Sequence, residues 1–246
     1  MPQGRTEYIE KSSPVIMRQV WKDLLFLHWR FDPECIAATL PPGLKVETFD
    51  GSAWVGIVPF RMEKIRVFGI PLPPGLRAFP EINLRTYVRD EEGRSGVWFY
   101  SLDAADRLAV WGARTFFHLN YRFAHMEVTR VGEEIVYASR RDREPVEKTD
   151  RFRWKAPEVG LMEAREGSLE HFLLERYRLF SAKKQGNQLY TGTVSHEPYR
   201  YKEAEVSEWS AHLFSLNQFA PMTRPPDSCL ASPGFPVAIH PLRRVR

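Results

Sequence analysis

The residues best suited to chemistry lie in one stretch of alternating polarity, 79–88. In a β-strand, successive side chains point to opposite faces. One face of this stretch would be apolar or β-branched, with Ile82, Leu84, Thr86 and Val88, and the other would carry Glu81, Asn83, Arg85 and Tyr87. The pattern leaves two alternatives open: the second face is exposed to solvent, or it lines a cleft or the interior of a barrel.

In the second alternative, the polar face has suitable groups for acting on a small acid. An arginine can bind a carboxylate through two parallel hydrogen bonds, so Arg85 would anchor an anion. A desolvated glutamate can donate or accept a proton, which makes Glu81 the candidate acid or base. Asn83 and Tyr87 share this face and would contact the same ligand.

Five further polar residues are candidates for ligand contact: His28, Ser101, Arg107, Tyr121 and His196. His28 ends an apolar run, which suits a core histidine as well as a pocket group. Ser101 lies in the next expected strand, and His196 ends another strand, where functional groups on loops are common. The sequence does not decide between packing and binding for these residues.

The common catalytic signatures do not occur in the chain. It contains no P-loop motif, no GxGxxG, no HExxH and no GxSxG, so nucleotide, zinc-protease and serine-hydrolase chemistry lose their usual sequence support. The seven histidines have no ligand-like spacing, and Cys35 and Cys229 are too few and too far apart for a metal cluster or a disulfide framework. We expect neither a metal nor a cofactor.

The elements that must position these residues are mostly strands. An Asp50-Gly51 turn predicts a hairpin of 44–49 and 52–60, because this dipeptide suits the positive φ of a tight turn. Further strands are expected at 81–89, 97–102, 120–128, 134–140, 150–156 and 188–195. Helices are expected at 104–117, with Leu108, Trp111 and Thr115 on one face, at 168–180 with Ser168 as N-cap, and within 207–219.

Composition agrees with one globular domain. The chain has 246 residues, of which 43% are hydrophobic and 27% charged, and no linker or repeat divides it. We predict a single α+β domain, 1–246, in which a large curved, mainly antiparallel sheet is accompanied by two or three helices. Its core would span about 20–241, and 1–15 and 242–246 are expected to be flexible.

Membrane insertion and secretion have no support in the sequence. The longest uncharged apolar stretch, 52–60, is far shorter than the roughly 18 residues that a spanning helix needs. The first 15 residues carry charges and no apolar run, so no secretory signal is visible and we expect a cytoplasmic protein.

The net charge of +4 is concentrated in a basic stretch, 140–155, and in the C-terminal arginines. Aromatic residues alternate with basic ones at 151–155, as in some nucleic-acid-binding surfaces. A half-buried strand shows the same alternation, and this second interpretation is favoured. Nucleic acid is therefore not favoured as a partner.

Several ordered motifs resemble the uncharacterised bacterial YqjF-like family: His28-Trp29, 40–44, 50–62, 81–88, 96–104 and 196–198. This family is placed in the acetoacetate decarboxylase-like superfamily, and the resemblance covers most of the chain, about 20–241. It implies one domain built around a cone-like β-barrel with an internal pocket for a small molecule.

The resemblance also marks a difference from the decarboxylases. Those enzymes form a Schiff base through a lysine pair in a segment similar to Trp-Gly-x-Pro-Lys-Lys. The similar segment here is 110–116, where Thr115 and Phe116 stand in place of the lysines, and no lysine occurs between Lys64 and Lys148. Glu81 is similar to a pocket glutamate of the decarboxylases, and Arg114 would replace the missing cation.

Two functional hypotheses follow. In the first, the protein is an enzyme that acts on a small anionic or oxo-bearing compound without a Schiff-base lysine, with Glu81 as acid or base and Arg85 as anchor. In the second, the same pocket belongs to a non-catalytic ligand-binding or sensor module. A homo-oligomer is compatible with both.

Overall fold

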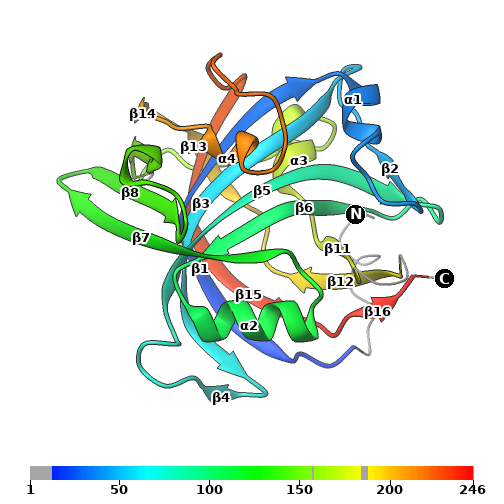
Figure 1. The fold of residues 1–246 in the computed structure, drawn as a ribbon, viewed down its shortest axis with the longest axis horizontal. Helices are drawn as coiled ribbons and strands as arrows, with labels where there is room; N and C mark the ends of the chain where they lie inside the picture. Colours follow the sequence, from blue (N-terminus) through cyan, green and yellow to red (C-terminus); the bar gives the residue numbers. More distant parts are fainter. Residues whose placement is uncertain (1–12, 157, 184–187, 246) are drawn as a thin grey trace.

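The structure is a computed structural model that describes residues 13–156, 158–183 and 188–245. Its larger elements alternate along the chain in the order shown in Figure 1. The first half contains β1 (Met17–Phe31), α1 (Pro33–Ala37), β2 (Leu44–Val46), β3 (Ala53–Val67), β4 (Ile70–Pro71), β5 (Phe79–Asp90), β6 (Ser95–Ala104), α2 (Arg107–Phe116) and β7 (Tyr121–Val131). The second half contains β8 (Glu134–Arg141), a 3-10 turn (Val146–Lys148), β9 (Asp150–Lys155), β10 (Met162–Glu163), α3 (Leu169–Leu174), β11 (Arg178–Ala182), β12 (Leu189–Ser195), β13 (Arg200–Glu203), β14 (Val206–Glu208), α4 (His212–Ser215), β15 (Ser228–Ile239) and β16 (Arg243–Arg244).

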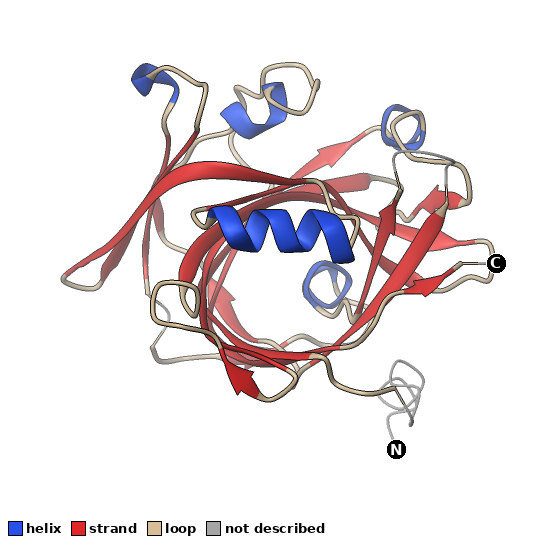
Figure 2. Ribbon diagram, turned by 60° about the horizontal axis from the view of Figure 1, so that its bottom comes forward, coloured by secondary structure: helices blue, strands red, loops and turns tan. Residues whose placement is uncertain are grey.

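Seven strands form a closed circuit of hydrogen-bonded neighbours, which we call the ring. The order is β6-β11-β12-β15-β1-β3-β5, and β5 pairs again with β6. All of these pairs are antiparallel except β11 with β6. Figure 2 looks toward one end of the ring, with the short helix α3 seen end-on inside it and α2 lying across the opening.

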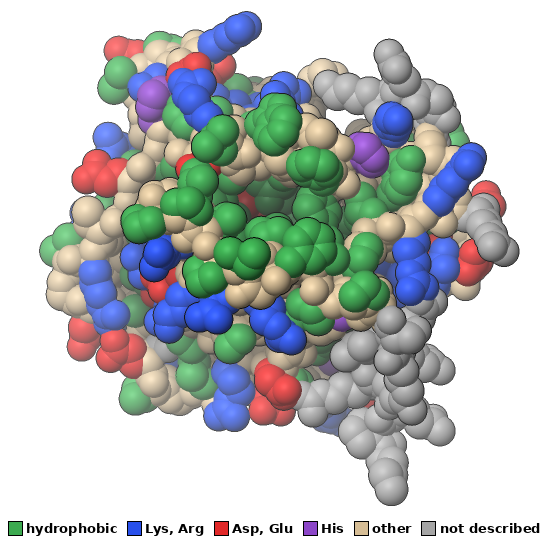
Figure 3. All heavy atoms as spheres, turned by 90° about the horizontal axis from the view of Figure 1, so that it is seen from below, with side chains coloured by type: hydrophobic (Ala, Val, Ile, Leu, Met, Phe, Trp, Pro, Cys, Tyr) green, Lys and Arg blue, Asp and Glu red, His purple; other side chains and the backbone are tan. Residues whose placement is uncertain are grey.

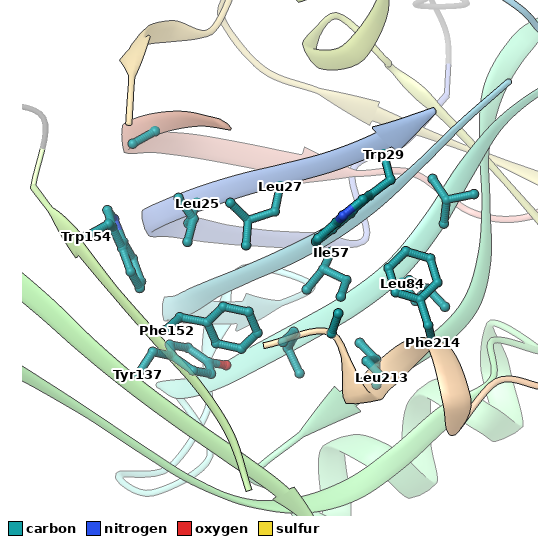
Figure 4. Packing of buried hydrophobic residues seen from close by; sticks show 14 of the residues in the cluster. Leu25, Leu27, Trp29, Ile57, Leu84, Tyr137, Phe152, Trp154, Leu213 and Phe214 are labelled. Atoms are coloured by element: carbon teal, nitrogen blue, oxygen red, sulfur yellow. The ribbon is translucent and has the colours of Figure 1, made fainter. Parts of the chain in front are cut away.

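The two faces of the ring strands pack against different partners because side chains alternate along each strand. Leu27, Ile57 and Leu84 point outward and pack against a smaller antiparallel sheet, β7-β8-β9, and against α4. Figure 4 shows Tyr137, Phe152 and Trp154 of that sheet facing them. The inward face carries Phe26 and its neighbours, together with Leu174 of α3.

The mostly β architecture was predicted correctly, and so were most of its strands. Those expected at 81–89, 97–102, 120–128, 134–140, 150–156 and 188–195 are β5, β6, β7, β8, β9 and β12. The short helix expected within 207–219 is α4. Asp50 and Gly51 form the expected turn, with φ values of 50° and 71°.

The hairpin pairing, however, was wrong. Phe49 and Ser52 form only an isolated bridge beside the turn. The strand β2 pairs instead with β5, with Leu44 opposite Asp90. The backbone of β2 therefore completes the free edge of β5, which would otherwise expose unpaired amides and carbonyls.

The helix expected at 168–180 is also much shorter than predicted. Ser168 is the N-cap, and its hydroxyl accepts a hydrogen bond from the backbone NH of His171, but α3 ends at Leu174. Residues Arg178–Ala182 form β11, which pairs with β12 and β6 and so closes the ring. Apolar residues of α3 and β11 both face the interior, which produced a helical period across two different elements.

The chain ends and α2 differ from expectation as well. Arg243–Arg244 form β16, paired with β12, within the tail expected to be flexible. Most of the N-terminal segment expected to be flexible, 1–12, lies outside the described residues. The helix α2 exists, with Asp106 as its N-cap, yet Leu108 and Trp111 are exposed rather than part of the core. No helix in the described part of the chain is long and apolar enough to span a membrane.

Candidate functional site

The polar face of β5 is buried inside the ring. Glu81, Asn83, Arg85 and Tyr87 are each at most 6% exposed. They share the inward face with Phe26 and His28 of β1, because β3 lies between β1 and β5 in a regular register. Of the two alternatives left open by the pattern, exposure to solvent is therefore excluded by the structure.

Arg85 is the centre of a hydrogen-bonded group at the middle of this face. One of its terminal nitrogens, Nη2, donates to the hydroxyl of Tyr87 at 3.2 Å and to the carbonyl of Leu173 at 3.0 Å. The Tyr87 hydroxyl also donates to the Leu173 carbonyl at 2.9 Å. The end of α3 thus fixes the guanidinium, whose plane also lies near the ring of Phe26.

His28 joins this group across an intervening strand, and Gly56 makes this possible. His28 lies opposite Gly56, which lies opposite Arg85. A Cβ atom at position 56 would lie 2.5 Å from His28 Nε2, which is too close for any real contact. Because glycine has no side chain, the imidazole can cross β3, and its Nε2 lies 2.6 Å from the Tyr87 hydroxyl.

The charge of Arg85 has no acidic partner among the described residues. No carboxylate oxygen of these residues lies within 4.0 Å of its guanidinium. Nearby Arg176 is paired with Glu47 at 2.7 Å, so that carboxylate is already neutralised. Burial, and secondarily the charge of Arg85, lower the pKa of His28 well below its usual range, so His28 is neutral. The site is therefore cationic.

Glu81 occupies the same face nearer the end covered by α2. Its Oε2 accepts a hydrogen bond from the Tyr121 hydroxyl at 2.8 Å. Burial raises the pKa of Glu81 to about 8, with Tyr121 opposing the rise and Asp103 adding to it. Glu81 is thus mostly protonated at neutral pH and can donate a proton.

The spacing along β5 separates the acid from the arginine. Four residues in a strand correspond to roughly 13 Å between the Cα atoms of Glu81 and Arg85. Asn83 lies halfway between them, and its Oδ1 is buried without a hydrogen-bond partner. Two other buried atoms on this face share that property, Arg85 Nε and His28 Nδ1.

A second polar group, which we call the outer network, lies on the opposite face of β6. Arg141 forms two hydrogen bonds with Asp103, at 2.6 and 3.0 Å, and a third with Ser101 at 2.8 Å. Asn217 also donates to the Ser101 hydroxyl, at 3.0 Å. Ser101 was expected beside Arg85, but the structure places it in the outer network.

The remaining candidates lie outside the group around Arg85. Arg107 is exposed on α2 and pairs with Asp142 at 3.3 Å, and Arg114 donates to the backbone carbonyl of Tyr121. His196 is packed between the rings of Tyr177 and Phe235. Of the residues singled out in the sequence, the structure brings together His28, Asn83, Arg85 and Tyr87, with Glu81 and Tyr121 as a second pair.

One end of the ring is open to solvent between apolar residues. Figure 3 views the molecule from the end at which α2 and β4 lie, and it shows a hollow rimmed by hydrophobic side chains. Trp111 and Phe116 of α2, and Phe68 and Ile70 near β4, are each at least 62% exposed. This end therefore offers an apolar approach toward the side of the ring that holds Glu81.

Sequence reasoning missed three contributors. Gly56 stands in a run of buried β-forming residues, where an isolated glycine signals close approach of another group. The carbonyl of Leu173 carries no sequence signal because every residue has one. The pairing of Asp103 with Arg141 joins residues far apart in the chain, so only the fold reveals it.

The site residues do not form a typical metal centre or a Schiff-base site. In the described part of the chain, no group of three or more His, Cys, Asp or Glu is arranged to hold a metal. No lysine is buried among those residues, and Thr115 and Phe116, which replace the lysine pair, are exposed on α2.

Comparison with known proteins places this fold and sequence together. Residues 18–236 match the family model DUF2071, which is described as an uncharacterized conserved protein. The chain belongs to this family. It is 43% identical over 193 residues to the uncharacterized protein YqjF of Bacillus subtilis (strain 168), covering 78% of this chain and 77% of that protein.

Solved structures show the same fold at low sequence identity. The enduracididine biosynthesis enzyme MppR with bound HEPES has a TM-score of 0.65 and 13% identity, covering 99% of this chain and 91% of that one. The acetoacetate decarboxylase of Legionella pneumophila has a TM-score of 0.64 and 14% identity, covering 100% and 92%. The fold is therefore that of the acetoacetate decarboxylase-like proteins.

Proposed function

We propose that the ring is a cone-like barrel whose interior binds a small organic anion, and that the protein is an enzyme acting on this compound. Arg85 binds the anionic group, and Glu81 supplies or accepts a proton. The observation that carries this proposal is the buried guanidinium of Arg85, which has no carboxylate partner among the described residues.

The physical reason is the cost of an uncompensated buried charge. A cation removed from water loses its hydration, and neutral hydrogen-bond partners recover only part of that free energy. The partners of Arg85 are a hydroxyl and a carbonyl, both neutral. A bound carboxylate would restore the missing charge and form short, charge-assisted hydrogen bonds.

Glu81 supports catalysis rather than binding alone. A carboxyl group whose pKa is raised to about 8 is protonated at neutral pH and close to the range in which proton transfer is efficient. Tyr121 fixes its orientation through the hydrogen bond to Oε2. Because no lysine is buried among the described residues, the reaction proceeds without a Schiff base.

Relatives with the same fold are consistent with an anionic ligand. Structures of MppR contain pyruvate in one case and HEPES in another, and both compounds carry an acidic group. These ligands belong to MppR, which is only 13% identical to this chain. They support the barrel interior as a ligand site.

A non-catalytic binding module is the alternative. It is favoured by the separation of Glu81 from Arg85, roughly 13 Å between Cα atoms, which a very short ligand would not span. In this case the same anion would bind to Arg85 and leave unchanged, as in a sensor or carrier.

The experiment measures binding and conversion in the same samples. Short carboxylates are titrated into the protein by calorimetry, and each mixture is then followed by NMR for new products. The enzyme proposal predicts that Glu81→Gln abolishes conversion and keeps binding, whereas Arg85→Met loses binding. Binding without any product supports the module, and no binding by any carboxylate would overturn both.

A further inference from the structure

We infer that the bound anion carries hydroxyl donors close to its acidic group, so that the ligand class is a hydroxycarboxylate rather than an oxo acid. This inference rests on the proposed anion site at Arg85 and specifies its chemistry. It follows from counting which atoms of the site can donate and which can only accept hydrogen bonds.

The hydrogen bonds of Tyr87 fix the position of the proton on His28. A tyrosine hydroxyl has one proton, and Tyr87 donates it to the carbonyl of Leu173, an atom that can only accept. The contact of 2.6 Å between the Tyr87 oxygen and His28 Nε2 then requires Nε2 to be the donor. Because His28 is neutral, its other nitrogen, Nδ1, carries no proton and is an acceptor.

Two acceptors therefore face the interior without a partner among the described residues. One is His28 Nδ1, and the other is Asn83 Oδ1, on the inward face of β5 next to Arg85. Both atoms are buried, and a buried acceptor without a donor costs about 1–3 kcal/mol. Each of them calls for an O–H or N–H group on the ligand.

One donor without a partner lies beside these acceptors. Arg85 Nε is buried and unpartnered, although Nη2 of the same guanidinium is engaged by Leu173 and Tyr87. An arginine presents Nε and a terminal nitrogen as a fork that matches a carboxylate. The site thus combines one position for an anionic acceptor with two positions for neutral donors.

An oxo acid matches this arrangement poorly. Its carboxylate suits Arg85, but a ketone oxygen can only accept and would leave the acceptors at His28 and Asn83 unsatisfied. A hydroxyl in the same place can donate to either acceptor. Sites built around hydrogen bonds reject analogues that lack the matching group, because the protein atoms are then left unpaired.

The test compares acids that differ only in this group. Lactate with pyruvate, malate with oxaloacetate, and 3-hydroxybutyrate with acetoacetate are titrated into the wild-type protein. We expect the hydroxy acid of at least one pair to bind about tenfold tighter or more. In Asn83→Leu, which keeps the side-chain size and removes the acceptor, this ratio should fall toward one.

The outcomes separate this inference from the function on which it rests. Equal or tighter binding of the oxo acids to the wild type, with binding lost in Arg85→Met, would overturn the inference and leave the anion site standing. If none of the six acids binds, both fall. Should Asn83→Leu fold poorly, His28→Phe removes the second acceptor and gives the same comparison, and the wild-type ratios decide the matter without any variant.

Discussion

Two buried arginines on opposite faces of the same sheet have very different surroundings. Arg141, in the outer network, holds both oxygens of Asp103 and also contacts Ser101. Arg85, inside the ring, contacts only neutral groups among the described residues. Both are largely removed from water: the side chain of Arg141 is 15% exposed, and Arg85 as a residue is 6% exposed.

The difference indicates that completeness of partners, rather than burial, separates a structural charge from one kept for a ligand. The outer network satisfies its own charges and holds β6, β8 and the segment after α4 together. The inner site leaves a positive charge and three polar atoms for something outside the described chain to satisfy. The first should matter for stability and the second for binding.

The largest expected effect is the loss of stability on removing Arg141. In Arg141→Met, Asp103 is left buried without its counter-charge, and breaking a buried ion pair in this way costs about 3–5 kcal/mol. Burial already raises the pKa of Asp103, and Arg141 opposes that rise. Urea unfolding would measure the loss.

The matched control is Arg107→Met on α2, where the pair with Asp142 is exposed and should contribute at most about 1 kcal/mol. Equal losses of unfolding free energy in the two variants would mean that the outer network does not stabilise the fold.

The next effect is a change in how stability depends on pH. Glu81 binds a proton more tightly in the folded state, because burial raises its pKa from the ordinary value of 4.5 to about 8. The folded protein therefore carries more protons than the unfolded chain between these values, and stability falls as pH rises from about 4.5 through 8. Glu81→Gln should flatten this slope.

Asp150 provides the comparison for that prediction. Burial raises its pKa to about 7, so Asp150→Asn should remove only the part of the slope below that pH. Denaturant midpoints from pH 5 to pH 9 measure both variants. An unchanged slope in Glu81→Gln would show that Glu81 is ionised in the folded protein.

The smallest effect is expected from adding one methyl group beside His28. In Gly56→Ala, the new Cβ would overlap His28 Nε2, so the imidazole must move away from Tyr87. Ligand affinity should fall several-fold while stability changes little, because the clash involves a side chain. Gly112→Ala in α2, where a Cβ meets nothing within 4 Å, should leave affinity unchanged and leave stability equal or higher. Equal affinities in the two variants would remove His28 from the site.

The inner face of β5 could be predicted from sequence because strict alternation of polar and apolar residues over eight positions is typical of a strand. The same rule failed on β6, where the pairing shifts by one residue: Ser101 faces Leu84 and Phe99 faces Arg85. Tyr100 is an extra residue between them, so alternation breaks there and Ser101 points outward. A bulge of this kind is set by the closing of the ring and leaves no local sequence signal.

The helical period at 168–180 misled for a related reason. Two consecutive elements, α3 and β11, each place apolar residues in the interior, and their sum imitates one long helix. The partners of Arg85 and Arg141 could not be predicted from the sequence either, since Leu173 and Asp103 reach them only through the pairing of distant strands.

The most direct test of the anion site is thermal unfolding of the wild type and Arg85→Met, each with and without lactate, malate or 3-hydroxybutyrate. A ligand that binds the folded state raises the melting temperature by mass action. We predict that without acid the variant melts at or above the wild-type temperature, since an unpaired buried charge has been removed, and that an acid stabilises only the wild type. A variant that melts far below the wild type, together with a wild type that no acid stabilises, would show that Arg85 is structural and contradict the proposed anion site.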